Sequence, residues 1–294
     1  MSIEKEPKPR VAVVTDSCCS IRPENKLAQE YEVTVIPVEI KFFENGRFVP
    51  YSDFEVTPQE FYQRMRTSKM LPQTSGAIPG KTVETFKKLS EETNSIISIH
   101  VTSRHSVVSE SAVLAKRLTQ EEMPELLIEV VDSKQISLGL WFLAEHAARL
   151  SKKGANLEQI KEEVLEMIPK VQLLAVLESF ENLKRGGRAD ELVKAYLASI
   201  LSIYPVLGVK EGKLELFTKA RSPKKARTTM IEMVGDSGEL VRMAVIHTNA
   251  PGMAEEVKEN LAKIYKGEIS IYEAGPVLGV HAGEGAVGIA FQKA

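Results

Sequence analysis

Residues 11–17 read VAVVTDS, a short run of β-branched residues that ends at an Asp-Ser pair. Residues 128–133 read IEVVDS and repeat that arrangement, an apolar run followed by Asp132-Ser133. Between these runs we expect two further extended stretches, Thr34–Phe43 and Ile96–Val101. We also expect three helices: one from Pro58 capped by Thr57, one at Gly80–Leu89 and one at Ser106–Leu118. Because strands and helices alternate, this half of the chain predicts a parallel sheet covered by helices.

The expected strands of this half end in polar pairs. Asp16-Ser17, Thr102-Ser103 and Asp132-Ser133 each follow an apolar run. Ligands of open parallel sheets bind beyond the carboxyl ends of the strands. We therefore expect a binding site close to these pairs.

The second half of the chain mixes hairpins with helices. Val206–Val209 and Leu214–Phe217 predict a hairpin that turns at Glu211-Gly212. The other expected elements are helices Leu138–Leu150 and Leu157–Ile168, strand Val171–Leu177, helix Glu191–Ile203, a helix from Ser222-Pro223, strand Met243–His247, helix Met253–Ile264 and strands Ile269–Glu273 and Ala286–Phe291. We therefore predict an α/β protein with two domains: an N-terminal α/β domain, residues 1–170, and a C-terminal α+β domain, residues 171–294.

Composition narrows the class of protein. Lys plus Arg is 38 and Asp plus Glu is 40, so the net charge of −2 gives no overall attraction to nucleic acid. The two cysteines, Cys18 and Cys19, are adjacent in sequence, which disfavours a disulfide between them. A zinc site would need a second pair of ligands at a suitable spacing, and the sequence shows none, so we predict no metal site. The charged start MSIEKEPKPR is not a secretory signal, and the longest uncharged run, Ala195–Val209, is too short to span a membrane. We expect a cytoplasmic protein.

Four short segments carry residues suited to chemistry. They are Thr74-Ser75-Gly76, Ser103–Ser106, the basic loop Lys184–Arg188 and the glycine-rich turn His281–Gly285. Each has an ordinary structural explanation, such as a helix cap at Ser106 or a turn residue at Thr74. Together, hydroxyl donors, a helix N-terminus and a histidine predict a receptor for a carboxylate or phosphate.

Known catalytic and phosphate motifs are absent from the sequence. It contains neither GxxxxGK[ST] nor a GxGxxG that follows a strand, and neither HExxH nor GxSxG. Ser106 and His281 are a possible nucleophile and base, but the sequence identifies no acid to orient the histidine. Anion binding is therefore favoured over catalysis, and we expect no cofactor and no metal.

Motifs in order along nearly the whole chain resemble the DegV family. They are VVTDS at 13–17, PQTS at 72–75, SxxS at 103–106 with Ser111-Ala112, VVDS at 130–133, LKRGGR at 183–188, KAR at 219–221 and GVHAGEGAVGIAF at 279–291. The resemblance implies a DegV-like fold with a parallel-sheet α/β/α domain and an α+β domain with a mixed sheet. It also implies a carrier, not an enzyme, that holds a long-chain fatty acid in a tunnel between the domains. Such carriers present the acid to a separate fatty-acid kinase, which makes acyl-phosphate for phospholipid synthesis.

The same resemblance assigns residues. Thr74 and Ser106 are expected to contact the carboxylate, and His281 is expected to lie beside it. Ser75 and Arg188 belong to motifs that match the family and are expected to bind the ligand as well. Arg221 matches a basic position associated with kinase docking. Three positions depart from the usual pattern: Val107-Val108 stands for glycine-threonine, Arg104-His105 for a small apolar pair, and Glu284 for proline.

The hydrocarbon tail and the charged carboxylate of a fatty acid lead to expectations about the residues that would surround each of them. A chain of about 14 to 18 carbons offers roughly 0.8 kcal/mol per buried methylene, on the order of 10 kcal/mol before the cost of ordering. We expect the apolar face of Glu191–Ile203 and parts of the first sheet to line the tail, and a protonated His281 is one option for holding the carboxylate.

Two other functions stay open at this point. The first is an enzyme, either a hydrolase that uses Ser106 and His281 or a phosphoryl carrier with His281 as nucleophile. The second is a regulator that binds a partner through a basic surface, formed by Arg185, Arg188, Arg221, Lys224, Lys225 and Arg227.

Overall fold

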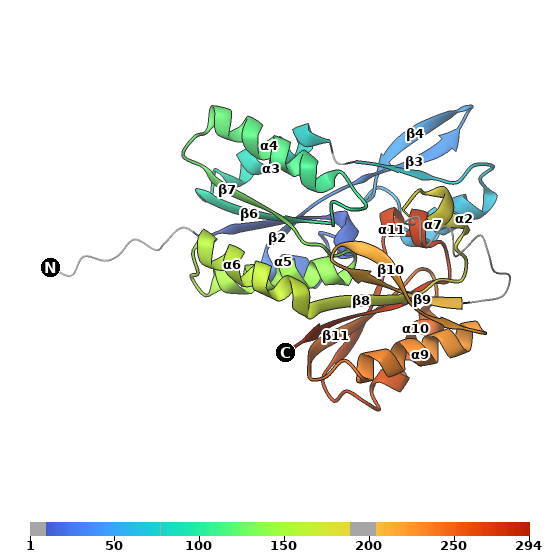
Figure 1. Ribbon diagram of the computed structural model, residues 1–294. Helices are drawn as coiled ribbons and strands as arrows, with labels where there is room; N and C mark the ends of the chain where they lie inside the picture. Colours follow the sequence, from blue (N-terminus) through green and yellow to red (C-terminus); the bar gives the residue numbers. More distant parts are fainter. Residues whose placement is uncertain (1–9, 77, 189–203) are drawn as a thin grey trace.

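A parallel four-stranded sheet forms the first layer of the molecule. The computed structural model describes residues 10–76, 78–188 and 204–294 (Figure 1). The strands lie in the order β2 (Val33–Ile36), β1 (Ala12–Asp16), β6 (Ser95–His100) and β7 (Leu127–Asp132). All three pairings are parallel, with Val13 opposite both Val33 and Ile97. The parallel sheet predicted from the alternating strands and helices is confirmed.

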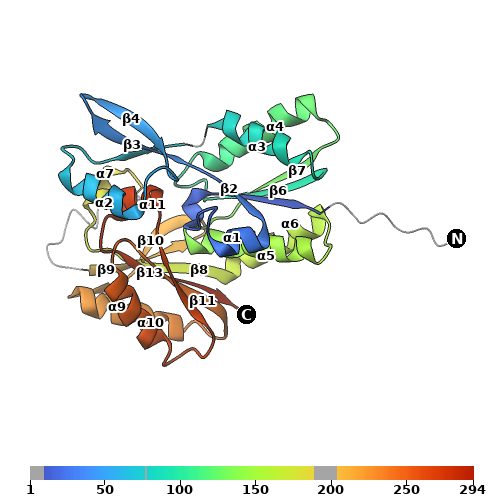
Figure 2. The same ribbon diagram turned by 180° about the vertical axis from the view of Figure 1, so that it is seen from behind.

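Helices cover both faces of this sheet, as the alternation of buried side chains requires. Val14 and Ile96 pack in a cluster that includes Phe86 of α3 (Pro79–Leu89) and Ala115 of α4 (Val108–Glu122). Val13 and Ile97 point the other way, into the large core beside α1 (Lys26–Tyr31), α5 (Leu138–Lys152) and α6 (Leu157–Met167). Figures 1 and 2 show the two groups of helices on opposite sides of the sheet.

The extended stretch expected at 34–43 is divided between two sheets. β2 ends at Ile36, and β3 (Glu39–Glu44) belongs to a separate antiparallel sheet with β4 (Arg47–Ser52) and β5 (Gln73–Ser75). Pro37 has no N–H for a sheet ladder, and the Val38 N–H is donated to the Ser17 hydroxyl instead. This small sheet and α2 (Pro58–Thr67) bring the segment around Thr74 toward the C-terminal half of the chain (Figure 2).

The second large sheet has six strands of mixed direction. Their order is β10 (Lys213–Ala220), β9 (Tyr204–Lys210), β8 (Val171–Val176), β13 (Val287–Lys293), β11 (Leu240–His247) and β12 (Ile269–Glu273). Helices α9 (Pro223–Gly235) and α10 (Pro251–Leu261) cover one face (Figure 1). All six strands come from residues 171–294. The division into domains at residue 170 itself remains a proposal.

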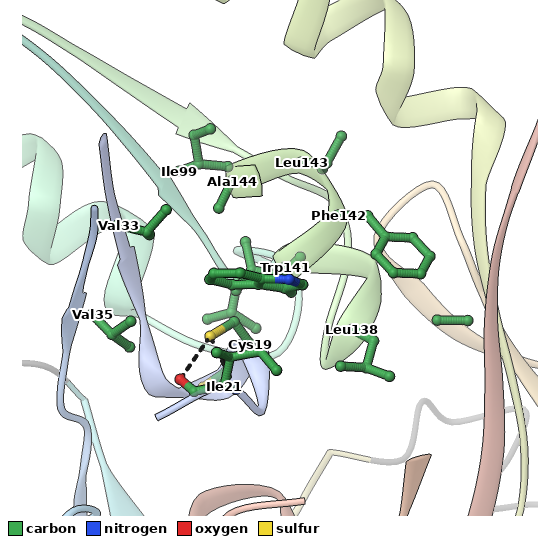
Figure 3. Close-up of a cluster of buried hydrophobic side chains, with 14 of the residues drawn as sticks. Cys19, Ile21, Val33, Val35, Ile99, Leu138, Trp141, Phe142, Leu143 and Ala144 are labelled. Carbon is green, nitrogen blue, oxygen red and sulfur yellow. Dashed lines mark hydrogen bonds between the residues drawn. The ribbon is translucent and has the colours of Figure 1, made fainter. Parts of the chain in front are cut away.

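Helix α5 lies between the two large sheets and packs on both. It contacts β1 and β6 of the first sheet and β8 and β13 of the second. Residues 138–145 are buried on every side of the helix, as expected of a helix between two layers, whereas Arg149 and Lys152 near its end are exposed. Figure 3 shows the Trp141 ring close to Cys19 and Leu138 in this core. Arg242 of β11 fixes the helix further, donating to the Phe142 carbonyl and lying 3.2 Å from Glu145.

The β9–β10 hairpin reaches across to the first sheet. Glu211 and Gly212 at its turn both have positive φ, 50° and 82°, which matches the tight turn predicted from the sequence. The Thr102 hydroxyl, just after β6, donates to the Gly212 carbonyl at 3.0 Å. A Cβ at position 212 would lie 2.5 Å from that hydroxyl oxygen, so glycine allows both the turn and the contact.

Three short helices were not predicted from the sequence: α1, α7 (Glu181–Arg185) and α11 (Pro276–Ala282). They are too short to show helical periodicity clearly. The helix expected at Glu191–Ile203 lies outside the described residues. Across the part of the chain that the structure describes, no helix combines the length and apolar character needed to cross a bilayer.

Candidate functional site

Thr74 and His281 meet at the centre of the candidate site. The Thr74 Oγ1 lies 3.0 Å from His281 Nε2. Thr74 is on strand β5, opposite Ile40 of β3, whereas the sequence predicted a loop. His281 is in the last turn of α11, whereas we expected a glycine-rich turn between strands; Pro276 begins the helix and Gly283, with φ 72°, ends it.

Helix α11 is held in place at its start and along its side. The buried Asp53 carboxylate accepts a hydrogen bond from the Val277 N–H at 3.0 Å. Burial raises the pKa of Asp53 to about 6, although that hydrogen bond acts in the opposite direction. At Gly279 a Cβ would lie 2.6 Å from the Phe61 ring, so this glycine lets α11 approach α2 closely. These contacts fix where His281 points.

The imidazole of His281 is neutral at physiological pH. Burial and, to a smaller extent, the nearby charge of Arg188 lower its pKa to about 4. These surroundings disfavour the cation, which argues against a protonated His281 in the protein without a ligand, and how His281 meets a bound carboxylate stays a prediction. Its Nδ1 is buried and has no hydrogen-bond partner among the described residues. A Cβ built on Gly186 would lie 2.5 Å from that nitrogen, so glycine at 186 makes room for the ring.

Ser106 and Val107 lie in the segment that leads into α4. The helix begins at Val108, and the Ser106 hydroxyl oxygen accepts the Val108 N–H at 3.3 Å. Val107, where the DegV pattern has glycine, is accommodated by Gly76, which follows β5. A Cβ on Gly76 would lie 2.4 Å from Val107 Cγ2, so the absence of a side chain at 76 leaves space for the valine.

The other predicted residues have different surroundings. The Ser75 hydroxyl donates to the Glu39 carboxylate at 3.2 Å. Arg188 donates to the carbonyls of Gly186 at 2.8 Å and His105 at 3.2 Å. Arg221 is exposed just before α9 and lines none of the cavities described below.

Two of the departures from the DegV pattern have structural roles. His105 Nε2 accepts the Leu214 N–H at 2.9 Å, which ties the segment before α4 to the β9–β10 hairpin. Glu284 accepts from Asn249 at 2.6 Å and from the Arg66 Nε at 2.9 Å.

Five of the predicted residues line one cavity of about 100 Å³, here called the inner cavity: Thr74, Ser75, Ser106, Arg188 and His281. Cys18 and Val101 also line it, so it lies beyond the carboxyl ends of β1 and β6, as the sequence predicted. The polar pairs themselves serve the fold: Asp16 is fully buried, and Asp132 accepts from Ser103.

A second space of about 120 Å³, the apolar cavity, adjoins the inner one. The two share five lining residues: Ile136, Leu183, Leu214, Leu278 and His281. Most of its other lining residues belong to the six-stranded sheet or follow its strands: Leu173, Ala175, Leu177, Leu207, Gly208, Val209, Ile246, His247, Thr248 and Ala286. None of the described residues that line this cavity belongs to a strand of the first sheet, and the expectation that this sheet lines the tail stays a prediction. Helix Glu191–Ile203, the other expected lining, lies outside the described residues.

On the other side of Thr74 and His281 lies an open, polar groove of about 470 Å³, the outer groove. Thr74, Arg188 and His281 line both this groove and the inner cavity. Lys69 and Arg185 add two more cations to the outer groove. The Thr74–His281 pair therefore separates an apolar interior from a basic surface.

One polar network was not anticipated from the sequence. Ser98 lies 2.6 Å from His100 Nε2, and His100 Nδ1 lies 3.0 Å from Asp16. This Ser-His-Asp chain resembles a catalytic triad, but all three residues are buried and none lines a cavity described above. Asp16 also accepts the N–H groups of Cys18 and Val101, so the network orders two residues of the cavity wall.

Within residues 10–76, 78–188 and 204–294, no three His, Cys, Asp or Glu side chains gather in a way that could hold a metal ion. The site is thus made of hydroxyls, one neutral imidazole and nearby guanidinium groups, which suits an anion with an apolar tail.

Known proteins resemble this chain over its whole length. A DegV domain-containing protein of Caldanaerobacter subterraneus is 32% identical over 293 residues, which cover 97% of this chain and 99% of that protein. Another, from Halalkalibacterium halodurans, is 31% identical over 293 residues and covers 96% of this chain and 98% of its own.

Solved structures show the same fold. DegV of Bacillus subtilis, a fatty acid binding protein, has 30% identity and a TM-score of 0.86 and covers 98% of this chain and 100% of its own. A DegV family protein of Thermus thermophilus, also described by its fatty acid binding, has 26% identity and a TM-score of 0.86 and covers 97% of this chain and 100% of its own. The family model described as "Uncharacterised protein, DegV family" matches residues 10–294. The chain therefore belongs to the DegV family.

Proposed function

We propose that this protein binds a long-chain fatty acid, with the carboxylate at Thr74, Ser106 and His281 and the tail in the apolar cavity. The observation that carries the proposal is the position of the Thr74–His281 pair between an apolar interior and a basic groove. The B. subtilis and T. thermophilus relatives, whose folds match this one, are described as binding fatty acids. Because the cavity residues come from both sides of residue 170, the ligand would lie between the two proposed domains.

The tail supplies most of the favourable free energy. Each buried methylene contributes roughly 0.8 kcal/mol, so a tail of about 14 to 18 carbons contributes on the order of 10 kcal/mol before the cost of ordering it. The apolar cavity is lined almost entirely by carbon, with Leu173, Leu207 and Ile246 among its walls, and its volume of about 120 Å³ holds only part of such a tail, so the space has to widen when a whole chain binds. A hydrocarbon chain suits this lining better than a polar ligand would.

The carboxylate is held by hydrogen-bond donors and not by an imidazolium. A neutral His281 with its proton on Nε2 donates to Thr74 Oγ1, so the threonine hydroxyl proton is directed to the ligand. The Ser106 oxygen already accepts the Val108 N–H, so its proton also points away, to the same ligand. Arg188 contributes a positive charge beside these donors, which offsets the cost of burying a carboxylate.

The protein would act as a carrier for a separate fatty-acid kinase. In that reaction a carboxylate oxygen attacks the γ-phosphorus of a nucleoside triphosphate, the bond from phosphorus to the β-phosphate oxygen breaks, and acyl-phosphate and nucleoside diphosphate form without a proton transfer. Acyl-phosphate would then enter phospholipid synthesis. The sequence of this chain has no phosphate-loop motif, which fits a nucleotide site on the partner. Arg221 is the proposed docking residue, and the need for a nucleotide is the reason to propose that the pair works in the cytoplasm.

The enzyme alternatives have weaker support. His281 forms its hydrogen bond with Thr74, and a pKa of about 4 makes it a poor general base at neutral pH. As a phosphoryl carrier it would need an accessible ring nitrogen. Nδ1, however, is buried against Gly186 and Nε2 bonds to Thr74.

The direct test is to extract the purified full-length protein with organic solvent and to quantify fatty acids by mass spectrometry. We expect about one fatty acid per chain, or stoichiometric uptake of palmitate by delipidated protein. A panel of ester substrates serves as the control for hydrolysis. Preparations that contain no lipid and bind no palmitate would refute the carrier function.

A further inference from the structure

The residues that line the outer groove suggest a second kind of ligand. The groove runs along the segment Lys69–Thr74 and the end of α7, and its lining includes three cations: Lys69, Arg185 and Arg188. Among the described residues that line it, none is acidic. A volume of about 470 Å³ open to the surface is far larger than a carboxylate requires.

Two of the three cations of the groove, Lys69 and Arg185, lie outside the head-group pair, whereas Arg188 also lines the inner cavity. Thr74, Arg188 and His281 form the partition, and Lys69 and Arg185 line only the outer side. Arg185 forms one ion pair, between its Nε and Glu181 at 2.8 Å, and both side chains are exposed. A guanidinium has five N–H donors, so this pair uses a minority of them.

We propose that the outer groove is a phosphate site continuous with the fatty-acid site. It would hold the phosphate of an acyl-phosphate whose tail remains in the apolar cavity, or the terminal phosphate of a nucleotide that approaches the carboxylate. The inference rests on the proposed function, because it takes the carboxylate to lie at Thr74 and His281.

Charge and donor number explain why the groove suits phosphate. A carboxylate has one negative charge and is satisfied by the hydroxyls of Thr74 and Ser106. A phosphate monoester has nearly two charges and three acceptor oxygens, and Lys and Arg side chains are its usual partners. Two added cations just beyond the hydroxyls therefore favour phosphate over carboxylate at this position.

The test compares two ligands with the same tail. Palmitate and hexadecyl phosphate, the latter a stable stand-in for acyl-phosphate, displace a fluorescent fatty acid from the full-length protein below their critical micelle concentrations. In the double variant Lys69→Gln/Arg185→Gln we expect the affinity for hexadecyl phosphate to fall about tenfold or more, with less than about a twofold change for palmitate.

A matched control removes the same charges elsewhere. Arg117 on α4 forms an ion pair four residues along its helix, with Glu121, as Arg185 does with Glu181. Lys88 is an exposed lysine on α3. The double variant Lys88→Gln/Arg117→Gln therefore matches the change in net charge, and we expect both ligands to bind it as they bind the unmodified protein. Circular dichroism melting verifies that both double variants are folded.

A further arm distinguishes the two sources of phosphate. Tripolyphosphate, which has no tail, is titrated into palmitate-loaded protein and its binding is followed by calorimetry. Binding that depends on Lys69 and Arg185 identifies the groove as a site for a nucleotide phosphate. Binding of hexadecyl phosphate alone identifies it as a site for the phosphate of the acyl product.

The remaining outcomes count against one claim or the other. If both ligands lose affinity equally in the Lys69/Arg185 variant, or neither loses any, the phosphate site is wrong while fatty-acid binding stands. If the unmodified protein binds neither palmitate nor hexadecyl phosphate, the proposed function itself fails.

Discussion

Thr74 Oγ1 and His281 Nε2 are 3.0 Å apart although 207 positions separate the two residues in the chain. The hydrogen bond joins strand β5, in the small sheet beside the N-terminal layer, to helix α11, which connects β12 and β13 of the six-stranded sheet. It thus forms part of the contact between the two halves of the chain. The candidate head-group site exists only when both halves are in place.

Thr74→Val tests whether the threonine hydroxyl holds the ligand. Valine has nearly the same shape but no hydroxyl, so it leaves His281 Nε2 and the carboxylate without this partner. We expect about a tenfold loss of palmitate affinity, measured by displacement of a fluorescent fatty acid. The control is Thr85→Val on α3, where the hydroxyl bonds only to the Lys81 carbonyl. Equal affinities in both variants would remove Thr74 from the site.

Gly186→Ala tests the room that the imidazole requires. An added Cβ would lie 2.5 Å from His281 Nδ1 and 3.0 Å from the Asn182 carbonyl oxygen, so the ring has to leave its present position beside Thr74. We expect weaker palmitate binding, while the fold is kept. Gly80→Ala, on α3 with no atom within 4 Å of the added Cβ, is the matched control and should bind normally. Unchanged binding by Gly186→Ala would show that the ring position does not matter.

His281 should give the folded protein a pH-dependent stability. Its pKa is about 4 in the folded state and ordinarily 6.5, so between these values the unfolded chain binds the extra proton. The stability from this residue is complete above about pH 6.5 and falls as the pH decreases toward 4, by as much as about 3 kcal/mol. Denaturant unfolding at pH 7.5 and 5 should therefore show a smaller loss of stability in His281→Asn than in the unmodified protein. Equal losses would contradict the low pKa.

Asp53 acts in the opposite direction over nearly the same range of pH. Its pKa is about 6 when folded and ordinarily 3.8, so the folded state retains a proton that the unfolded chain has released. The stability associated with this carboxyl is present below pH 3.8 and is lost as the pH rises through 6. Asn can still accept the Val277 N–H, so Asp53→Asn should gain stability relative to the unmodified protein between pH 4 and 7, by up to about 3 kcal/mol. A stability difference independent of pH would refute this.

The layers of the fold were predictable because they follow from local patterns. The β-branched run at 11–17 and the alternation of strand and helix gave the parallel sheet, and Glu211-Gly212 gave the hairpin turn. Helix α11 was missed because its seven residues, with glycine at 279, look like a turn in the sequence. Its helical state depends on Asp53 and α2, contacts that are distant along the chain.

The candidate site was predictable as a set of residues but not as an arrangement. Motifs pointed to Thr74, Ser106 and His281, and all three line the inner cavity. The neutral state of His281 could not be predicted, because its pKa depends on burial and on Arg188 nearby. The side chains that line the apolar cavity could not be predicted for the same reason: apolar side chains of both sheets look alike in sequence, and only the packing shows which of them face a space.

Arg221→Gln tests the proposed docking to a kinase. Arg221 is exposed between β10 and α9 and lines none of the three spaces around the head-group site, so its loss should leave palmitate affinity unchanged. If it contacts an acidic surface of the kinase, the variant should form acyl-phosphate more slowly at limiting carrier concentration, with a weaker dependence on salt. Arg47→Gln, which removes an exposed arginine from β4, is the control and should support the normal rate. If both variants give equal rates of acyl-phosphate formation at every carrier concentration, Arg221 is excluded from docking. A docking contact raises the rate at which carrier and kinase associate, and association limits acyl-phosphate formation when the carrier concentration is low.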